Sequence, residues 1–135
     1  MQLQMYLHFN GQCEEALKYY QQHLGAEILF MMQFKGSPAA SETPAEWQDK
    51  IMHATLRVGN VQIMASDGMN GQAQQKSHGF SLSLTPNSLE QAEKVFVVLS
   101  EKGKVTMPLQ KTYFALRFGS LIDQFGIPWM IHLEK

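Results

Sequence analysis

An approximate internal repeat constrains this chain of 135 residues more than any other feature. Residues 2–9 and residues 80–85 both alternate polar and apolar side chains, which is typical of a half-buried strand. Each is followed by a helical segment with a candidate N-cap at its start and a glycine fifteen residues later, from Asn10 to Gly25 and from Ser88 to Gly103. Chance rarely produces two such segments of equal length, so the sequence predicts two modules that are built alike.

Three further strands are predicted after each helical segment. The six ranges are residues 26–34, 51–58 and 61–67 in the first module and residues 104–108, 114–123 and 128–133 in the second. The predicted fold class is therefore α+β, with the order β-α-β-β-β occurring twice. One domain of residues 1–135 would contain the first module over 1–67, a polar linker over 68–78 and the second module over 79–135.

The stretch of residues 35–50 interrupts the first module and is rich in Pro, Ser, Ala and Gly. Its composition predicts a mobile loop. Two interpretations stay open, a tolerated surface insertion and a lid that closes over a binding site.

Charge and apolar patterning exclude several classes of function. The formal net charge is −1, so the chain has no strong electrostatic reason to bind nucleic acid or an anionic membrane. No apolar run is long enough for a transmembrane helix, and the first residues lack the basic and apolar segments of a signal peptide. Cys13 is the only cysteine, which excludes an intrachain disulfide. We expect a cytoplasmic protein.

Three strings carry a resemblance to a known family. The segment GKVTMPLQKTYFALRFGSLIDQFGIPWMIHLEK (103–135) resembles the C-terminal half of PhnB-like proteins, and its DQFGIPW run (123–129) is specific to that subgroup. FNGQCEEALKYYQQHLGAE (9–27) and MHATLRVGNVQIMASDGM (52–69) resemble the opening helix and the hairpin of the same family. PhnB-like proteins belong to the vicinal-oxygen-chelate superfamily, with glyoxalase I, extradiol dioxygenases and bleomycin-resistance proteins. One departure is Tyr113-Phe114, where the subgroup usually has Phe-Trp.

The resemblance implies two paired βαβββ modules, each with a curved sheet that carries its helix on the convex side. The concave side would form a pocket for a small-molecule ligand, often completed by a second copy of the chain. We therefore expect a homodimer, which would also protect the open sheet edges.

Strand alternation selects candidate pocket residues, because the side chains that do not face the helices should face the pocket. Alternation selects Tyr6, His8, His53, Arg117 and His132, and the aromatic Trp129 is a further candidate, for the pocket wall or the core. Each also has a structural interpretation. The histidines would be exposed or hydrogen-bonded packing residues, Arg117 would pair with an Asp or Glu instead of a ligand carboxylate or phosphonate, and Trp129 would belong to the core.

The resemblance also implies a divalent metal site in some members, held by about four His, Glu or Gln side chains. Of the corresponding positions in this chain, only Gln4 and His78 carry credible ligands, and two ligands bind a metal ion weakly. A shift of register would bring in Asp67, His132 or Glu134. We favour no cofactor, and a divalent metal ion is the one cofactor that stays an alternative.

Three functions remain as hypotheses. The first is a small-molecule-binding protein that is non-catalytic or weakly metal-dependent. The second is a metal-dependent lyase, isomerase or dioxygenase-like enzyme, and the third is a structural dimer whose pocket is filled by its own side chains. Some members of the group carry a methyltransferase label, but the sequence has no glycine loop of the kind that binds S-adenosylmethionine, so we do not expect that activity.

Overall fold

The computed structural model describes residues 1–68 and 78–135. The chain divides into two compact units, Met1–Gln74 and Gln75–Lys135. Most of the predicted linker, 68–78, lies outside the described residues. No helix among the described residues is long and apolar enough to span a membrane.

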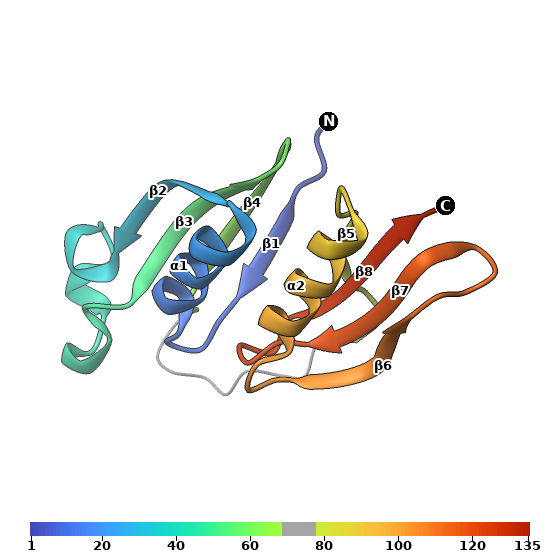
Figure 1. Cartoon of the computed structure of the whole chain (residues 1–135). Helices are drawn as coiled ribbons and strands as arrows, with labels where there is room; N and C mark the ends of the chain where they lie inside the picture. The colour runs from blue at the N-terminus through green and yellow to red at the C-terminus, as the bar shows by residue number, and fades with distance from the viewer. Residues whose placement is uncertain (69–77) are drawn as a thin grey trace. The chain divides into compact units, whose positions relative to one another are not determined.

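The first unit contains one helix and a four-stranded sheet (Figure 1). Its elements are β1 (Met5–His8), α1 (Cys13–Leu24), β2 (Glu27–Gln33), β3 (Ile51–Val58) and β4 (Val61–Ser66). The strand order is β1-β4-β3-β2, in which β1 runs parallel to β4 and the other pairs are antiparallel.

The second unit repeats this plan. Its elements are β5 (Leu82–Leu84), α2 (Leu89–Ser100), β6 (Lys104–Gln110), β7 (Ala115–Ile122) and β8 (Pro128–Glu134). The order β5-β8-β7-β6 has the same parallel first pair and antiparallel remainder. The predicted fold of two βαβββ modules is confirmed.

Each helix packs on one face of its own sheet and leaves the other face without a helix of that unit (Figure 1). From α1, the apolar positions Cys13, Ala16, Leu17 and Tyr20 are buried, as their helical spacing predicts. In the second unit Phe96 of α2 lies against Gly119 of β7, where a Cβ would come within 2.8 Å of the phenyl ring. Glycine is needed there because the helix approaches the strand so closely.

The predicted helix ends are right in two cases and wrong in two. Ser88 caps α2 by accepting a hydrogen bond from the Gln91 amide at 3.0 Å, and Gly25 ends α1 in the left-handed conformation. Asn10 does not cap α1. The helix begins three residues later, and its first amide, that of Cys13, donates to the carboxylate of Asp67, directly after β4. After α2 the residue with a positive φ is Lys102 and not Gly103. Gly103 is required for space instead, because a Cβ there would lie 2.3 Å from the Ile122 carbonyl oxygen.

The stretch 35–50, for which composition predicts a mobile loop, contains no strand or α-helix. It forms three short 3-10 turns, η1 (Phe34–Gly36), η2 (Ala40–Glu42) and η3 (Ala45–Trp47). The Gln48 side-chain amide donates to the carbonyl oxygens of Ala40 and Thr43, both at 2.8 Å, and the Trp47 indole donates to that of Gly68 at 2.9 Å. Side-chain donors thus satisfy backbone groups that regular secondary structure would otherwise pair.

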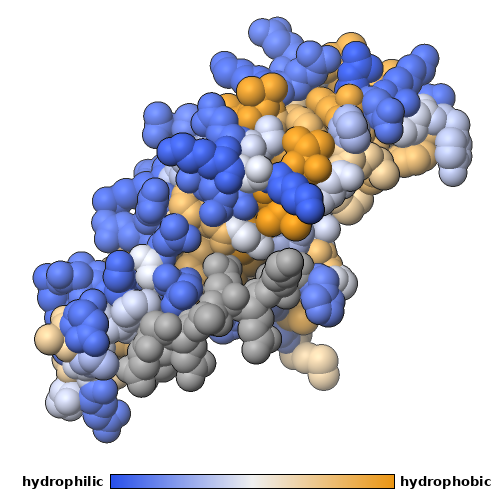
Figure 2. Space-filling model, turned by 90° about the horizontal axis from the view of Figure 1, so that it is seen from below, coloured by the Kyte–Doolittle hydropathy of each residue, from blue (hydrophilic) through white to orange (hydrophobic). Residues whose placement is uncertain are grey.

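Hydrophilic side chains predominate on the surface drawn in Figure 2, with apolar side chains gathered in a limited area. Large apolar residues that are at least two-fifths exposed include Phe30 in the first unit and Phe114 in the second. Both belong to ring clusters on the sheet faces without helices.

Candidate functional site

The face of the first sheet opposite α1 brings together three of the predicted site residues. Strand pairing places Tyr6 beside Met64, Met64 beside Thr55 and Thr55 beside Phe30, so these four side chains form one row across the sheet. In the next row His8 pairs with Ser66 and His53 with Met32. Residues two apart on a strand share a face, so both rows lie on the same side.

Four rings on this face make direct contacts, and we call Tyr6, His8, Phe30 and His53 the open-face cluster. The Tyr6 hydroxyl lies 3.3 Å from Nδ1 of His53. The Tyr6 ring stacks on His8 with centroids 4.9 Å apart and an interplanar angle of 27°. The Phe30 ring lies next to His53, with the two ring centroids 6.2 Å apart. Two neighbouring rings, those of His8 and Phe30, thus lie against the phenol–imidazole pair.

Phe30 is the member that the sequence prediction missed. A β-bulge between Ile28 and Phe30 shifts the pairing with β3, so simple alternation along β2 does not give the side chain's face. Its side chain is 44% exposed, and its contact with the His53 ring, which only the structure shows, makes it a member of the cluster.

The Tyr6–His53 contact leaves a hydrogen-bond donor available whichever atom donates. When the phenol donates to Nδ1, the neutral imidazole carries its proton on Nε2. When Nδ1 donates to the phenol oxygen, the phenol proton is free instead. Neither side chain has a second hydrogen bond among the described residues. The pair can therefore donate one further hydrogen bond to an acceptor.

The corresponding face of the second sheet carries His132 with two phenylalanines. His132 pairs with Phe118 across β7 and β8, and edge-to-face contacts join its ring to Phe118 at 5.7 Å and to Phe114 at 5.8 Å. Nε2 of His132 is buried and has no hydrogen-bond partner in the described part of the chain. The open-face histidines thus lie in both units, His8 and His53 in the first and His132 in the second.

Arg117 does not lie on an open face, contrary to the prediction. It shares the phase of Gly119 and Leu121, which face α2, and its Nε lies 3.5 Å from a carboxylate oxygen of Glu93 on that helix. Its Nη1 also donates to the Leu116 carbonyl oxygen at 2.7 Å. The structural interpretation, an ion pair with an acidic residue, describes this guanidinium.

Trp129 belongs to the core, the structural one of its two interpretations, and not to an open face. Its side chain is 3% exposed, and the indole N–H donates to Oδ2 of Asp123 at 2.9 Å. The other oxygen of Asp123 accepts from the amides of Phe125 and Ile127, at 2.9 and 3.0 Å, so Asp123 caps the turn before β8 as expected. An indole whose donor must be satisfied on burial finds its partner in this carboxylate.

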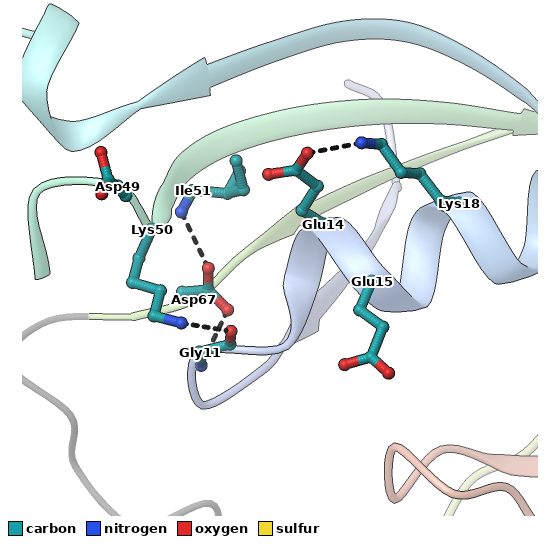
Figure 3. Close-up of a pocket in the computed structure, with 8 residues that line it drawn as sticks. All are labelled: Gly11, Glu14, Glu15, Lys18, Asp49, Lys50, Ile51 and Asp67. Atoms are coloured by element: carbon teal, nitrogen blue, oxygen red, sulfur yellow. Dashed lines mark hydrogen bonds and ion pairs between the residues drawn. The ribbon is translucent and has the colours of Figure 1, made fainter.

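A separate pocket of about 360 Å³ opens beside the start of α1 (Figure 3). Its lining residues are Gly11, Glu14, Glu15, Lys18, Asp49, Lys50, Ile51 and Asp67. At its base the Asp67 carboxylate accepts hydrogen bonds from the amides of Gly11, Cys13 and Ile51, each at 2.8 Å. A carboxylate from the end of β4 therefore caps α1 and holds the first residue of β3.

Most of the polar side chains of this Asp67 pocket bind other groups of the same unit and so stabilise its fold. The Lys50 ammonium donates to the Gly11 carbonyl oxygen at 3.0 Å, and two surface ion pairs, Lys18–Glu14 and Lys35–Asp49, involve the acidic residues of its rim. Cys13 lies beneath it, and burial raises the pKa of its thiol far above the ordinary value, with smaller contributions from the charges of Asp67 and Glu14. A thiol kept neutral in this way is a poor nucleophile.

The residues considered for a metal site do not form one within either unit. Gln4 is exposed and precedes β1, and His78 is exposed and precedes β5. Asp67 is committed to three backbone amides, and Glu134 is exposed at the end of β8. Over its described residues, neither unit brings together three His, Cys, Asp or Glu side chains that could hold a metal ion.

Known proteins resemble this chain over nearly its full length. A family model described as 3-demethylubiquinone-9 3-methyltransferase matches residues 1–132. Protein YjdN of Escherichia coli (strain K12) is 38% identical over 144 residues, which cover 100% of this chain and 97% of YjdN. A solved structure from Bacillus cereus, described as a putative 3-demethylubiquinone-9 3-methyltransferase, PhnB protein, is 25% identical with a TM-score of 0.84, over 98% of this chain and 99% of the other.

One more distant structure shares the fold. The genomically encoded fosfomycin resistance protein FosX from Listeria monocytogenes is 10% identical with a TM-score of 0.65, and the match covers 100% of this chain and 93% of FosX. Two four-stranded mixed sheets with one helix each are thus a fold that widely diverged sequences adopt.

Proposed function

Since this chain belongs to the 3-demethylubiquinone-9 3-methyltransferase family and has the PhnB-like, glyoxalase-like fold that its sequence predicts, we propose that it is a small-molecule-binding protein. The ligand would lie on the open face of the first sheet. One observation carries the proposal: Tyr6, His8, Phe30 and His53 converge there from three strands, and the Tyr6–His53 pair keeps a donor for an acceptor on a ligand. A binding site needs no more than apolar walls and a few polar anchors.

The family's description does not lead us to propose methyl transfer. A methyltransferase of the expected kind binds S-adenosylmethionine at a glycine loop on a doubly wound parallel sheet. The described residues instead form two mixed sheets with one parallel strand pair in each. We therefore propose binding without a methyl-transfer step.

A metal-dependent reaction is the alternative, and no observed donor set favours it. The open-face cluster has two imidazoles and a phenol, and the strand positions beside them carry Met64, Thr55 and Ser66. The hard oxygen donors that complete a catalytic divalent site are missing from these two rows. The third hypothesis, a structural dimer whose pocket is filled by its own side chains, stays a prediction.

A melting experiment tests the proposal. Chelator-treated protein would be melted with a panel of small organic anions and aromatic compounds, and separately with Zn²⁺, Ni²⁺, Mn²⁺, Fe²⁺ and Mg²⁺. A ligand of the folded state at 100 times its Kd adds about 2.7 kcal/mol, which is a shift of several degrees in Tm. We expect at least one organic compound to give such a shift.

The variants make the result specific to the site. The double variant Tyr6→Phe, His53→Leu removes the donor pair and should abolish the shift. His23→Leu is the matched control, because His23 also contacts an aromatic ring, Tyr19, but lies on α1 away from the sheet face. A shift with metal ions alone would replace binding with the metal-dependent alternative, and no shift with either panel would refute the proposal.

A further inference from the structure

We infer that the open-face cluster binds a planar conjugated ring that carries an anionic oxygen group, with an aromatic carboxylate as the simplest member of that class. This inference rests on the proposed function and adds the chemistry of the ligand. Three properties of the cluster lead to it: an unused donor, exposed ring faces and the absence of a carboxylate beside them.

The Tyr6–His53 pair supplies the hydrogen-bond donor for the ligand. Its contact of 3.3 Å leaves either the Nε2 proton or the phenol proton without an acceptor among the described residues. A ligand with an acceptor oxygen completes this pair, whereas a ligand that offers only donors does not. Hydrogen bonds to a charged acceptor are stronger than those to a neutral one, which favours a carboxylate over an amide.

The four aromatic and imidazole rings of the cluster form a surface that suits a flat ring. Tyr6 and His8 are stacked at 27°, whereas the His53 ring is tilted by 44° to Tyr6 and by 48° to Phe30. The rings come from β1, β2 and β3, and the β4 position between His8 and His53 is the short side chain of Ser66. Aromatic pairs gain from stacked or edge-to-face contact, so a flat conjugated ring fits this surface better than a saturated ring of equal size.

The charges on the same face favour an anionic ligand over a cationic one. The two rows that contain the cluster include no Asp or Glu. Asp67, directly after β4, and Glu27, at the start of β2, are engaged elsewhere: Asp67 binds three backbone amides, and Glu27 pairs with Arg57. An anionic ligand therefore meets two imidazoles and a phenol without facing a like charge.

The experiment compares three probes on the full chain. 1-Naphthoate has both the ring and the charge, 1-naphthamide has the ring without the charge, and cyclohexanecarboxylate has the charge without a conjugated ring. Affinities would be measured by calorimetry, and the imidazole proton resonances of His8 and His53 would be followed by NMR. We expect naphthoate to bind at least tenfold more tightly than either other probe and to shift both imidazole signals.

Two substitutions separate the ring from the donor. Phe30→Leu keeps an apolar side chain but removes a ring, and should weaken naphthoate about three- to tenfold while leaving cyclohexanecarboxylate unchanged. Tyr6→Phe keeps the ring but removes the hydroxyl, and should weaken naphthoate about tenfold. Val97→Ala on α2 is an exposed control in the second unit that should change neither affinity.

The failures are distinguishable. If naphthamide or cyclohexanecarboxylate binds less than tenfold more weakly than naphthoate, the ligand class is wrong and the proposed binding function stands. If naphthoate binds while the His8 and His53 signals stay fixed, the placement is wrong. If none of the three binds, the inference is overturned, and the wider melting panel decides separately whether the chain binds small molecules at all.

Discussion

Replacing Asp67 by alanine should lower the free energy of unfolding by about 3–5 kcal/mol. The Asp67 side chain is 3% exposed, and it accepts hydrogen bonds from three amides at 2.8 Å. A net hydrogen bond to a charged group contributes about 1.5–3 kcal/mol, and the loss of a helix cap alone costs about 0.5–2 kcal/mol. Three full contributions would exceed the estimate, but water from the adjacent pocket can reach some of the freed amides, which reduces the sum.

The variant Asp67→Asn should cost about 2–3 kcal/mol. It retains one acceptor oxygen, which can serve either Ile51 or the Gly11 and Cys13 amides, but it turns an N–H donor toward the remaining ones. The expected order of stability is therefore wild type, then asparagine, then alanine.

Urea unfolding followed by far-UV circular dichroism measures both losses as a change in midpoint at constant slope. Asp49→Ala is the matched control, because Asp49 lines the same pocket but is 78% exposed and pairs only with Lys35 at the surface. Its expected cost is below about 0.5 kcal/mol. If Asp67→Ala costs less than about 1 kcal/mol, or no more than Asp49→Ala, the capping argument is refuted.

Four other measurements follow from the structure. Because burial holds the Cys13 thiol neutral, stability should fall above pH 9.0, where the unfolded thiol ionises, by up to about 1.4 kcal/mol per pH unit; Cys13→Ala should lack this part of the loss in urea titrations. Ser88→Ala should cost about 1 kcal/mol by removing the cap on the Gln91 amide, and a cost near zero would contradict it. Gly103→Ala should be strongly destabilising, because its Cβ would lie 2.3 Å from the Ile122 carbonyl oxygen, whereas Gly36→Ala, with open space around it, should unfold near the wild-type midpoint. Light scattering should give about twice the chain mass of 15.3 kDa, and a monomer would contradict the proposed homodimer.

The repeat and the strand periodicity were sufficient to predict the fold, because each module buries one face of its sheet and thereby fixes the alternation of side chains. Tyr6 and His8 lie where this alternation puts them. Arg117 does not, because two of the helix-facing positions of β7 are small: Ala115 and Gly119 make room for α2, while the larger Leu116, Phe118 and Ile122 occupy the other phase. A pattern based on apolar size therefore assigns the wrong face to this strand.

The cap of α1 was beyond local sequence reasoning for a different reason. Asn10 has the right chemistry and the right place in the sequence, but the carboxylate that does the work comes from a residue 54 positions from Cys13. Phe30 was missed because a bulge, which no residue type in this strand marks, resets the phase of β2. Local patterns thus identify the strands, and contacts between distant segments decide the details of the site.

The contact between Phe96 and Gly119 restricts the order in which this family's sequences can diverge. A side chain at position 119 would come within 2.8 Å of the phenyl ring and 2.9 Å of the Leu109 Cα, so alanine is excluded while the ring is present and the edge strand keeps its place. A smaller residue at position 96 relieves only the first of these conflicts. Divergence here therefore needs coordinated change in a helix and an edge strand, and a glycine at the β7 position should outlast changes in the residues around it.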